Sequence, residues 1–158
     1  MSSFAVEERG ALLLMTVSRE PTTAEFEQTL RVFEARLARR ERCVFIFDAV
    51  RVSNLPAELR QRQGEWLREH DAAIRAWVLG VAFVFSSAIP RFVLSSIFLV
   101  KPLPIPYTVC ATQAEAIAWA DQTMRLAGLS PDPSSAGASI ARPSPSTPPP
   151  TTTRRRPR

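Results

Sequence analysis

The most apolar stretch of the sequence runs from Trp77 to Val100 and contains a single charged residue, Arg91. About 20 apolar residues can cross a bilayer as a helix, so a membrane span is the first reading to test. Residues 80–85 are instead β-branched and aromatic over the length of a strand. Ser86-Ser87 and Pro90 then supply the start signals of a separate helix. Because a charge at mid-bilayer costs about 2.5 to 3.5 kcal/mol, we predict a buried strand followed by an apolar helix, not a transmembrane segment.

The rest of the chain divides into two parts by composition. The formal net charge is +5, but the residues from Leu129 onward carry five arginines against one acid and account for +4. That part also holds eight of the 14 prolines and no aromatic residue. Such a segment cannot bury enough apolar surface to offset the entropy of ordering it. We predict one domain over residues 1–128, nearly neutral and without a basic face for specific nucleic-acid binding, and a disordered Pro/Ser/Thr/Arg-rich tail over 129–158.

The residues that could carry chemistry are few. Cys43 and Cys110 have neither metal-ligand spacing nor a disulfide framework, so we expect buried free thiols and no metal or other cofactor. His70 is the only histidine and lies in a polar helical stretch, which favours a surface position over a catalytic base. The acids Glu7 and Glu8 stand where a secretory signal needs positive charge, so we expect a cytoplasmic protein. No nucleophile–base pair can be assembled, and the sequence indicates a protein that is not an enzyme.

The first half of the chain predicts two strands, a helix, a strand and a second helix. Two short apolar runs within residues 4–17 indicate a hairpin. Thr22 and Glu25 match a capping box, which opens an amphipathic helix ending near residues 39–40. Residues 43–47 form a short apolar run typical of a central strand, closed by Asp48. A single long helix is expected over residues 56–74, with four side chains pointing inward: Leu59, Trp66, Leu67 and Ile74.

The second half predicts a strand and a helix after the apolar stretch. Three alternating prolines in residues 101–106 require an extended backbone. Residues 107–110 form a short strand. Thr112 and Glu115 match a second capping box, opening a helix that Gly128 ends.

Three residues near the end of the central strand are candidate contacts for a ligand or partner. Asp48 lies at the carboxyl end of this strand, where open α/β sheets place their ligand crevices. It could equally cap the following loop or pair with an arginine such as Arg91, which is itself a fourth candidate contact. Arg51 lies in the loop, and so does Ser53, which with Asn54 is expected to cap the next helix.

Two further surfaces are predicted to meet partners. The helix over residues 92–99 has almost no polar face, and one sheet can cover only one side of it. We therefore expect an interface, homotypic or with another protein, through Phe92, Val93, Phe98 and Leu99. The arginines of the tail suit a partner or weak contact with an anionic surface: Arg154, Arg155, Arg156 and Arg158.

The order of elements resembles that of the STAS domain, the fold of the anti-sigma-factor antagonists. Residues 80–84, Arg91 and residues 115–119 are similar to phrases in divergent bacterial STAS-like proteins. The resemblance implies a mixed sheet of four to five strands packed with about four helices, and a non-catalytic role in protein interaction. In switching antagonists a phosphorylatable serine lies in an Asp-Ser-Ser-Gly-like turn. Here the equivalent region, residues 52–56, lacks that turn, so we do not expect Ser53 to be a regulatory phosphosite.

Two functions follow as hypotheses. The first is a non-enzymatic, cytoplasmic, regulatory interaction domain of STAS-like type with a disordered basic tail. The alternative is a binder of a small apolar ligand or lipid, with a pocket under the helix over residues 92–99.

Overall fold

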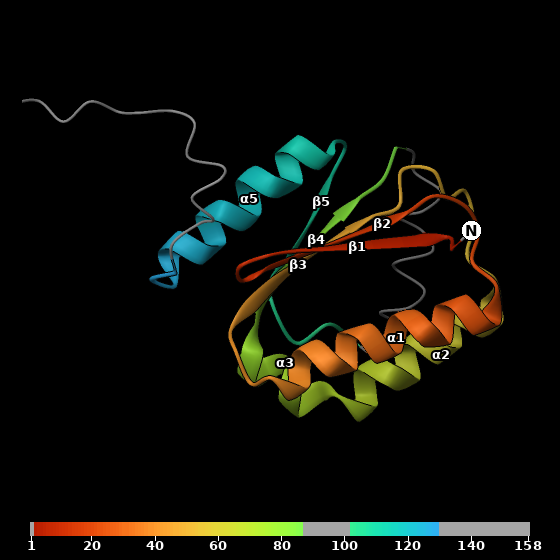
Figure 1. Cartoon of the computed structure of the whole chain (residues 1–158), viewed down its shortest axis with the longest axis horizontal. Helices are drawn as coiled ribbons and strands as arrows, with labels where there is room; N and C mark the ends of the chain where they lie inside the picture. Colours follow the sequence, from red (N-terminus) through yellow and green to blue (C-terminus); the bar gives the residue numbers. More distant parts are fainter. Residues whose placement is uncertain (1, 87–101, 130–158) are drawn as a thin grey trace, which may run out of the picture.

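The computed structural model describes residues 2–86 and 102–129, which form a mixed five-stranded sheet covered by helices (Figure 1). The strands are β1 (Phe4–Arg9), β2 (Leu12–Val17), β3 (Cys43–Asp48), β4 (Val78–Val84) and β5 (Tyr107–Cys110). They lie in the order β1-β2-β3-β4-β5, with β1 antiparallel to β2 and the other neighbours parallel. The predicted α/β class and the mixed sheet are confirmed.

The helices lie on both faces of the sheet. Three of them, α1 (Thr23–Ala38), α2 (Ala57–Glu69) and α3 (Asp71–Trp77), cover one face, and α5 (Gln113–Leu126) covers the other (Figure 1). Because successive strand residues point to opposite faces, Phe45 packs toward the three helices while its neighbour Val44 packs toward α5. The alternation along each strand thus builds two separate cores.

The first two strands form the predicted hairpin. Phe4 pairs with Val17 and Arg9 pairs with Leu12, so the pairing continues through the Glu7–Arg9 segment. Gly10 in the turn has φ 57°, a left-handed conformation that glycine adopts without steric cost.

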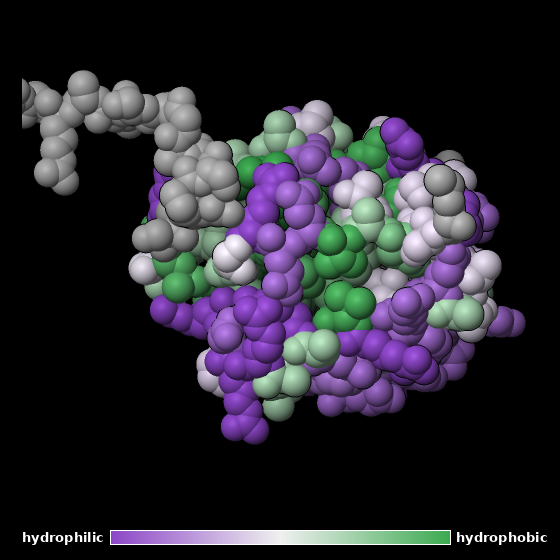
Figure 2. Space-filling model, viewed as in Figure 1, coloured by the Kyte–Doolittle hydropathy of each residue, from purple (hydrophilic) through white to green (hydrophobic). Residues whose placement is uncertain are grey.

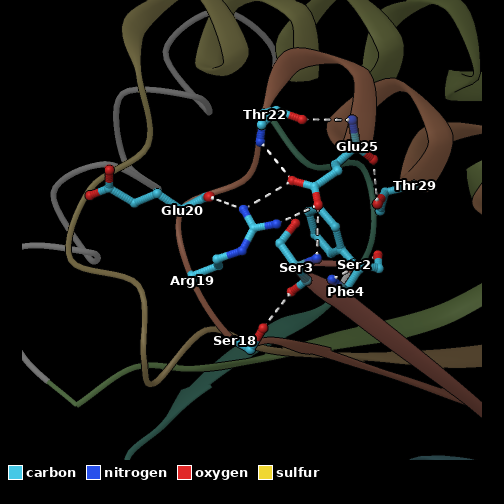
Figure 3. Close-up of polar contacts among 9 residues, drawn as sticks. All are labelled: Ser2, Ser3, Phe4, Ser18, Arg19, Glu20, Thr22, Glu25 and Thr29. Carbon is cyan, nitrogen blue, oxygen red and sulfur yellow. Dashed lines mark hydrogen bonds and ion pairs between the residues drawn. The ribbon is translucent and has the colours of Figure 1, made fainter.

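The capping box at the start of α1 is confirmed and also ties the helix to β1 (Figure 3). The hydroxyl of Thr22 accepts from the Glu25 N–H (3.3 Å), and the Glu25 carboxylate accepts from the Thr22 N–H (2.9 Å). The same carboxylate accepts from the Ser3 N–H (3.0 Å) and from the Arg19 guanidinium (2.7 Å). These donors lower the pKa of Glu25 from its ordinary 4.5 to about 2, and the Thr22 N–H has the largest effect.

The prediction of one helix over residues 56–74 is wrong, because the chain breaks at His70 between α2 and α3. His70 has φ −107° and ψ 12°, outside the helical range, and its ring stacks on Trp66 with centroids 4.5 Å apart. Its Nδ1 lies 2.9 Å from the Trp66 carbonyl oxygen, which also accepts from the His70 backbone N–H. A local side-chain bond of this kind competes with continued helix. The four predicted inward side chains are nevertheless buried.

The start of α2 also differs from the prediction. Its N-cap is Pro56, which makes no side-chain capping bond, so neither Ser53 nor Asn54 caps the helix. The Ser53 hydroxyl donates instead to the Glu20 carboxylate (3.4 Å).

The opposite face is closed tightly by α5. Thr112 caps this helix by accepting from the Glu115 N–H (3.3 Å), but the Glu115 carboxylate accepts from the Ala111 N–H instead of completing the predicted box. Gly128, with φ 77°, follows its end as expected. The indole of Trp119 lies over Gly80 in β4, where an added Cβ would stand 2.5 Å from the ring.

Several predictions concern residues outside the described ranges. The predicted tail lies outside them except for its first residue, Leu129. The predicted helix over residues 92–99 and Arg91, which precedes it, also lie outside them. The domain boundary at residue 128 and the tail contacts stay predictions. Within residues 2–86 and 102–129, no helix has both the length and the apolar character that crossing a membrane would require.

Candidate functional site

The carboxyl ends of the four parallel strands lie at one edge of the sheet. The longest described connection there is the loop over residues 49–56, between β3 and α2, which we call the β3–α2 loop. The start of α1, with Glu20, lies beside it. Open α/β sheets place their ligands and contacts at this kind of edge. Asp48, Arg51 and Ser53 all lie there, so the structure brings together three of the four predicted contacts.

Asp48 positions this loop and offers no unpaired oxygen. The residue is 8% exposed, one carboxylate oxygen accepts from the Val50 N–H (3.2 Å), and the other accepts from the Gln113 side-chain amide (2.9 Å). Of the roles that the sequence left open for Asp48, the structure shows the capping of its loop. Arg91, the suggested ion-pair partner, lies outside the described residues. Asp48 also joins the loop to α5, a contact that sequence spacing did not reveal.

The β3–α2 loop is held to the sheet at several other points. The Ala49 N–H donates to the Val84 carbonyl (3.0 Å), and the Ser86 hydroxyl donates to the Val50 carbonyl (3.1 Å). Arg51 and Ser53 are exposed, and the Ser53 hydroxyl donates to the Glu20 carboxylate at 3.4 Å. The loop therefore presents an anchored surface with an aliphatic side chain, a cation and a hydroxyl.

The groups with intrinsic reactivity lie away from this edge or are shielded. Both cysteines are buried free thiols, as predicted. Burial raises the pKa of Cys43 to about 11 and also raises that of Cys110, which suppresses the reactive thiolate. His70 is half-buried against Trp66 instead of exposed. In the part of the chain that the structure describes, no three His, Cys, Asp or Glu side chains gather to hold a metal ion.

An apolar cavity lies between the sheet and the layer of α1 and α2. Its volume is about 140 Å³. The described lining includes Trp66 and every phenylalanine of the described ranges: Phe4, Phe26, Phe33, Phe45, Phe47, Phe83 and Phe85. Figure 2, viewed as Figure 1, shows hydrophobic residues reaching the surface between the sheet and α1. The pocket was predicted under residues 92–99, which lie outside the described part. The described walls come from the sheet, the three helices on this face, the β3–α2 loop, and Leu103 and Ile105 before β5.

The cavity and the loop share a boundary. Ala49 and residues 52–55 belong to the β3–α2 loop and also line the cavity. Among the described residues of the lining, the polar ones are Ser53, Asn54 and Gln63, and none is charged. The sequence did carry one signal for this cavity: Phe45 and Phe47, like Phe83 and Phe85, are two apart and so share a face.

Comparison with known proteins identifies the fold. No protein-family model matches the sequence, and no curated protein matches it either. The chain is similar to the crystal structure of an uncharacterized protein from the DUF3478 family with a SpoIIAA-like fold, from Shewanella loihica PV-4. The identity is 15% and the TM-score 0.55, over 74% of this chain and 91% of that one. An anti-sigma factor antagonist from Mycobacterium paratuberculosis matches with 16% identity and a TM-score of 0.47, over 74% and 92%. The first likeness confirms the SpoIIAA-like, STAS-like fold.

Proposed function

We propose that this chain is a non-enzymatic regulatory domain that acts in the cytoplasm by binding a protein, either another chain or a second copy of itself. The SpoIIAA-like fold supports an interaction domain of STAS-like type. The observation that carries the proposal is the anchored, exposed β3–α2 loop at the carboxyl edge of the parallel strands.

This loop suits binding because it is ordered before a partner arrives. Asp48 and Ser86 hold the Val50 backbone from both sides, so little conformational entropy remains to be lost on association. Val50 is 39% exposed and its neighbour Arg51 is also exposed. An aliphatic side chain beside an arginine is a combination that partner-binding surfaces favour, since arginine combines charge with a large apolar stem.

The contact does not depend on phosphorylation of Ser53 in this proposal. The hydroxyl of Ser53 lies 3.4 Å from the Glu20 carboxylate, so a phosphate there would face a like charge. Ser53 instead contributes a hydrogen-bonding group at the rim of the loop.

The proposal includes two further contacts that rest on the sequence alone. The apolar residues Phe92, Val93, Phe98 and Leu99 would extend the interface or make a homotypic one. The tail arginines would add weak, salt-dependent attraction to an acidic partner or surface.

A photo-crosslinking side chain at position 51 tests the loop, with the same side chain at position 125 as the control. Arg125 is equally exposed but lies on α5, on the other face of the sheet. In living cells we expect one discrete crosslinked protein from position 51 and not from position 125. In binding assays with that protein, Arg51→Glu should weaken the affinity about tenfold, whereas Arg125→Glu should leave it within about twofold.

Two results would contradict the proposal. One is equal crosslinking from both positions, which would indicate contact without a preferred surface. The other is an Arg51→Glu variant that binds the crosslinked protein as tightly as the wild type.

A further inference from the structure

We propose that the cavity between the sheet and the α1/α2 layer binds a small, neutral, single-ring aromatic molecule, of which phenol is the type. This inference does not depend on the protein-binding function. It rests on the size of the cavity, the chemistry of its walls and the uncharged character of the lining residues that the structure describes.

The volume sets the size of the ligand. A cavity of about 140 Å³ is close to the engineered protein cavity of about 150 Å³ that stays dry and binds benzene. Protein interiors are otherwise close-packed, and the atoms lining a void lose their dispersion contacts on that side. A ligand the size of one ring would restore those contacts, and a two-ring molecule would not fit.

The walls favour an aromatic ligand over an alkyl chain. Phe33 lies between Phe45, with centroids 5.1 Å apart, and Trp66, with centroids 6.0 Å apart. Phe83 makes an edge contact with Phe47 at 6.3 Å and a stacked contact with Phe85 at 6.1 Å. Rings at these separations attract through tilted or offset geometry, and an added ring can join the set in the same way.

The polar groups of the lining decide the charge of the ligand. A carboxylate or ammonium group would lose its hydration and find no opposite charge among the lining residues of the described ranges. One hydroxyl on the ring can instead bond with the amide of Gln63 or Asn54, or with Ser53. Asn54 and Ser53 are exposed and therefore lie at the rim of the cavity. A neutral phenol meets both conditions.

Titration of the full chain with benzene, phenol and benzoate, followed by NMR and calorimetry, tests the proposal. We expect saturable binding of benzene and phenol, with ligand-to-protein nuclear Overhauser effects at the Trp66 indole. Benzoate, which carries the same ring with a charge, should bind at least about tenfold more weakly than phenol. Absence of saturable phenol binding, or benzoate binding as tight as that of phenol, overturns the proposal.

A matched pair of variants in one loop locates the site. Val52 lines the cavity, whereas Val50, two residues earlier, does not. Val52→Trp should fill the space and weaken phenol binding at least about tenfold, and Val50→Trp should change it less than about twofold. Equal effects of the two changes would place the ligand elsewhere and overturn the proposal.

A second variant keeps the test valid if Val52→Trp does not fold. Phe47 is only half-buried, so its shortening to alanine enlarges the cavity at a tolerable cost. Phe47→Ala should bind naphthol, which the wild type should not. A wild-type chain that binds naphthol as well as phenol would contradict the predicted ligand size.

Discussion

The two faces of the sheet are packed in different ways. On the α5 face small residues stand at the closest approach of helix and sheet: Ala116 and Ala120 are fully buried, and Gly80 lies directly under the Trp119 ring. On the other face large rings from β3 and β4 meet Phe26 and Phe33 of α1, and a cavity remains between them.

The difference shows how one sheet serves two purposes. Small residues let a helix approach the strands closely, and α5 packs on its face of the sheet in this way. Rings such as Phe33 and Phe45 are rigid and bulky, and they cannot fill every space between a twisted sheet and two helices. The face with imperfect packing is also the face bordered by the β3–α2 loop. We therefore read the α5 face as structural support and the α1/α2 face as the functional side.

The largest expected effect comes from shortening neighbouring residues on β3. Ile46 is 1% exposed and faces α5, so Ile46→Ala should lower the free energy of unfolding by about 2–5 kcal/mol. Phe47→Ala should cost less, because its ring is partly exposed and already borders a cavity. Urea unfolding of both variants measures the difference. A larger loss at Phe47 would remove the distinction between the two faces.

The next largest effect comes from enlarging an alanine on each face. Ala120 is fully buried against the sheet, and Ala120→Leu should destabilise the fold by about 1–3 kcal/mol through overpacking. Ala49 is also buried but lines the cavity, so Ala49→Leu should be neutral or stabilising by up to about 1 kcal/mol. Equal destabilisation by both changes, measured by thermal and urea unfolding, would indicate that the cavity walls cannot accept added volume.

A smaller loss of stability is expected from removing Asp48, which joins the β3–α2 loop to α5. Asp48→Ala removes the acceptor of the Val50 N–H and of the Gln113 amide, and should cost about 1–2 kcal/mol. The control is Gln113→Ala, which leaves the bond to Val50 in place and should cost about half as much. Hydrogen exchange at Val50 should rise in Asp48→Ala and stay near the wild-type rate in the control. The reverse order would show that Asp48 does not anchor the loop.

The smallest effect concerns the polar contacts that hold the start of α1. Because the Glu25 pKa is lowered from 4.5 to about 2 in the folded chain, its contribution is complete above pH 4.5 and is lost as the pH falls toward 2. Glu25→Gln should therefore lower the melting temperature at pH 7 and change it little near pH 2. Melting curves between these values measure the effect. A constant difference between the two proteins across this range would contradict the prediction.

The sequence alone determined the strands, most helix starts and the fold class. A strand that is buried on both faces is apolar at successive positions. The short apolar runs at residues 43–47 and 80–85 were therefore recognisable as strands from the sequence alone. Thr22 and Thr112 cap helices through bonds that span three residues, and such local signals are complete in the sequence. Gly80 and Trp119 were part of the STAS-like phrases, although only the structure shows that they touch.

Tertiary structure decided the features on which function depends. At the break, the His70 ring stacks on Trp66, and both rings contact the Glu34 carboxylate on α1, which residues 56–74 alone cannot supply. Asp48 was recognisable as a strand end, but its bond to Gln113 joins residues 65 positions apart. The cavity exists because rings from two strands and α1 fail to fill the space between them. Such contacts depend on how complete elements pack in three dimensions, and a linear pattern carries no measure of the volume left between them.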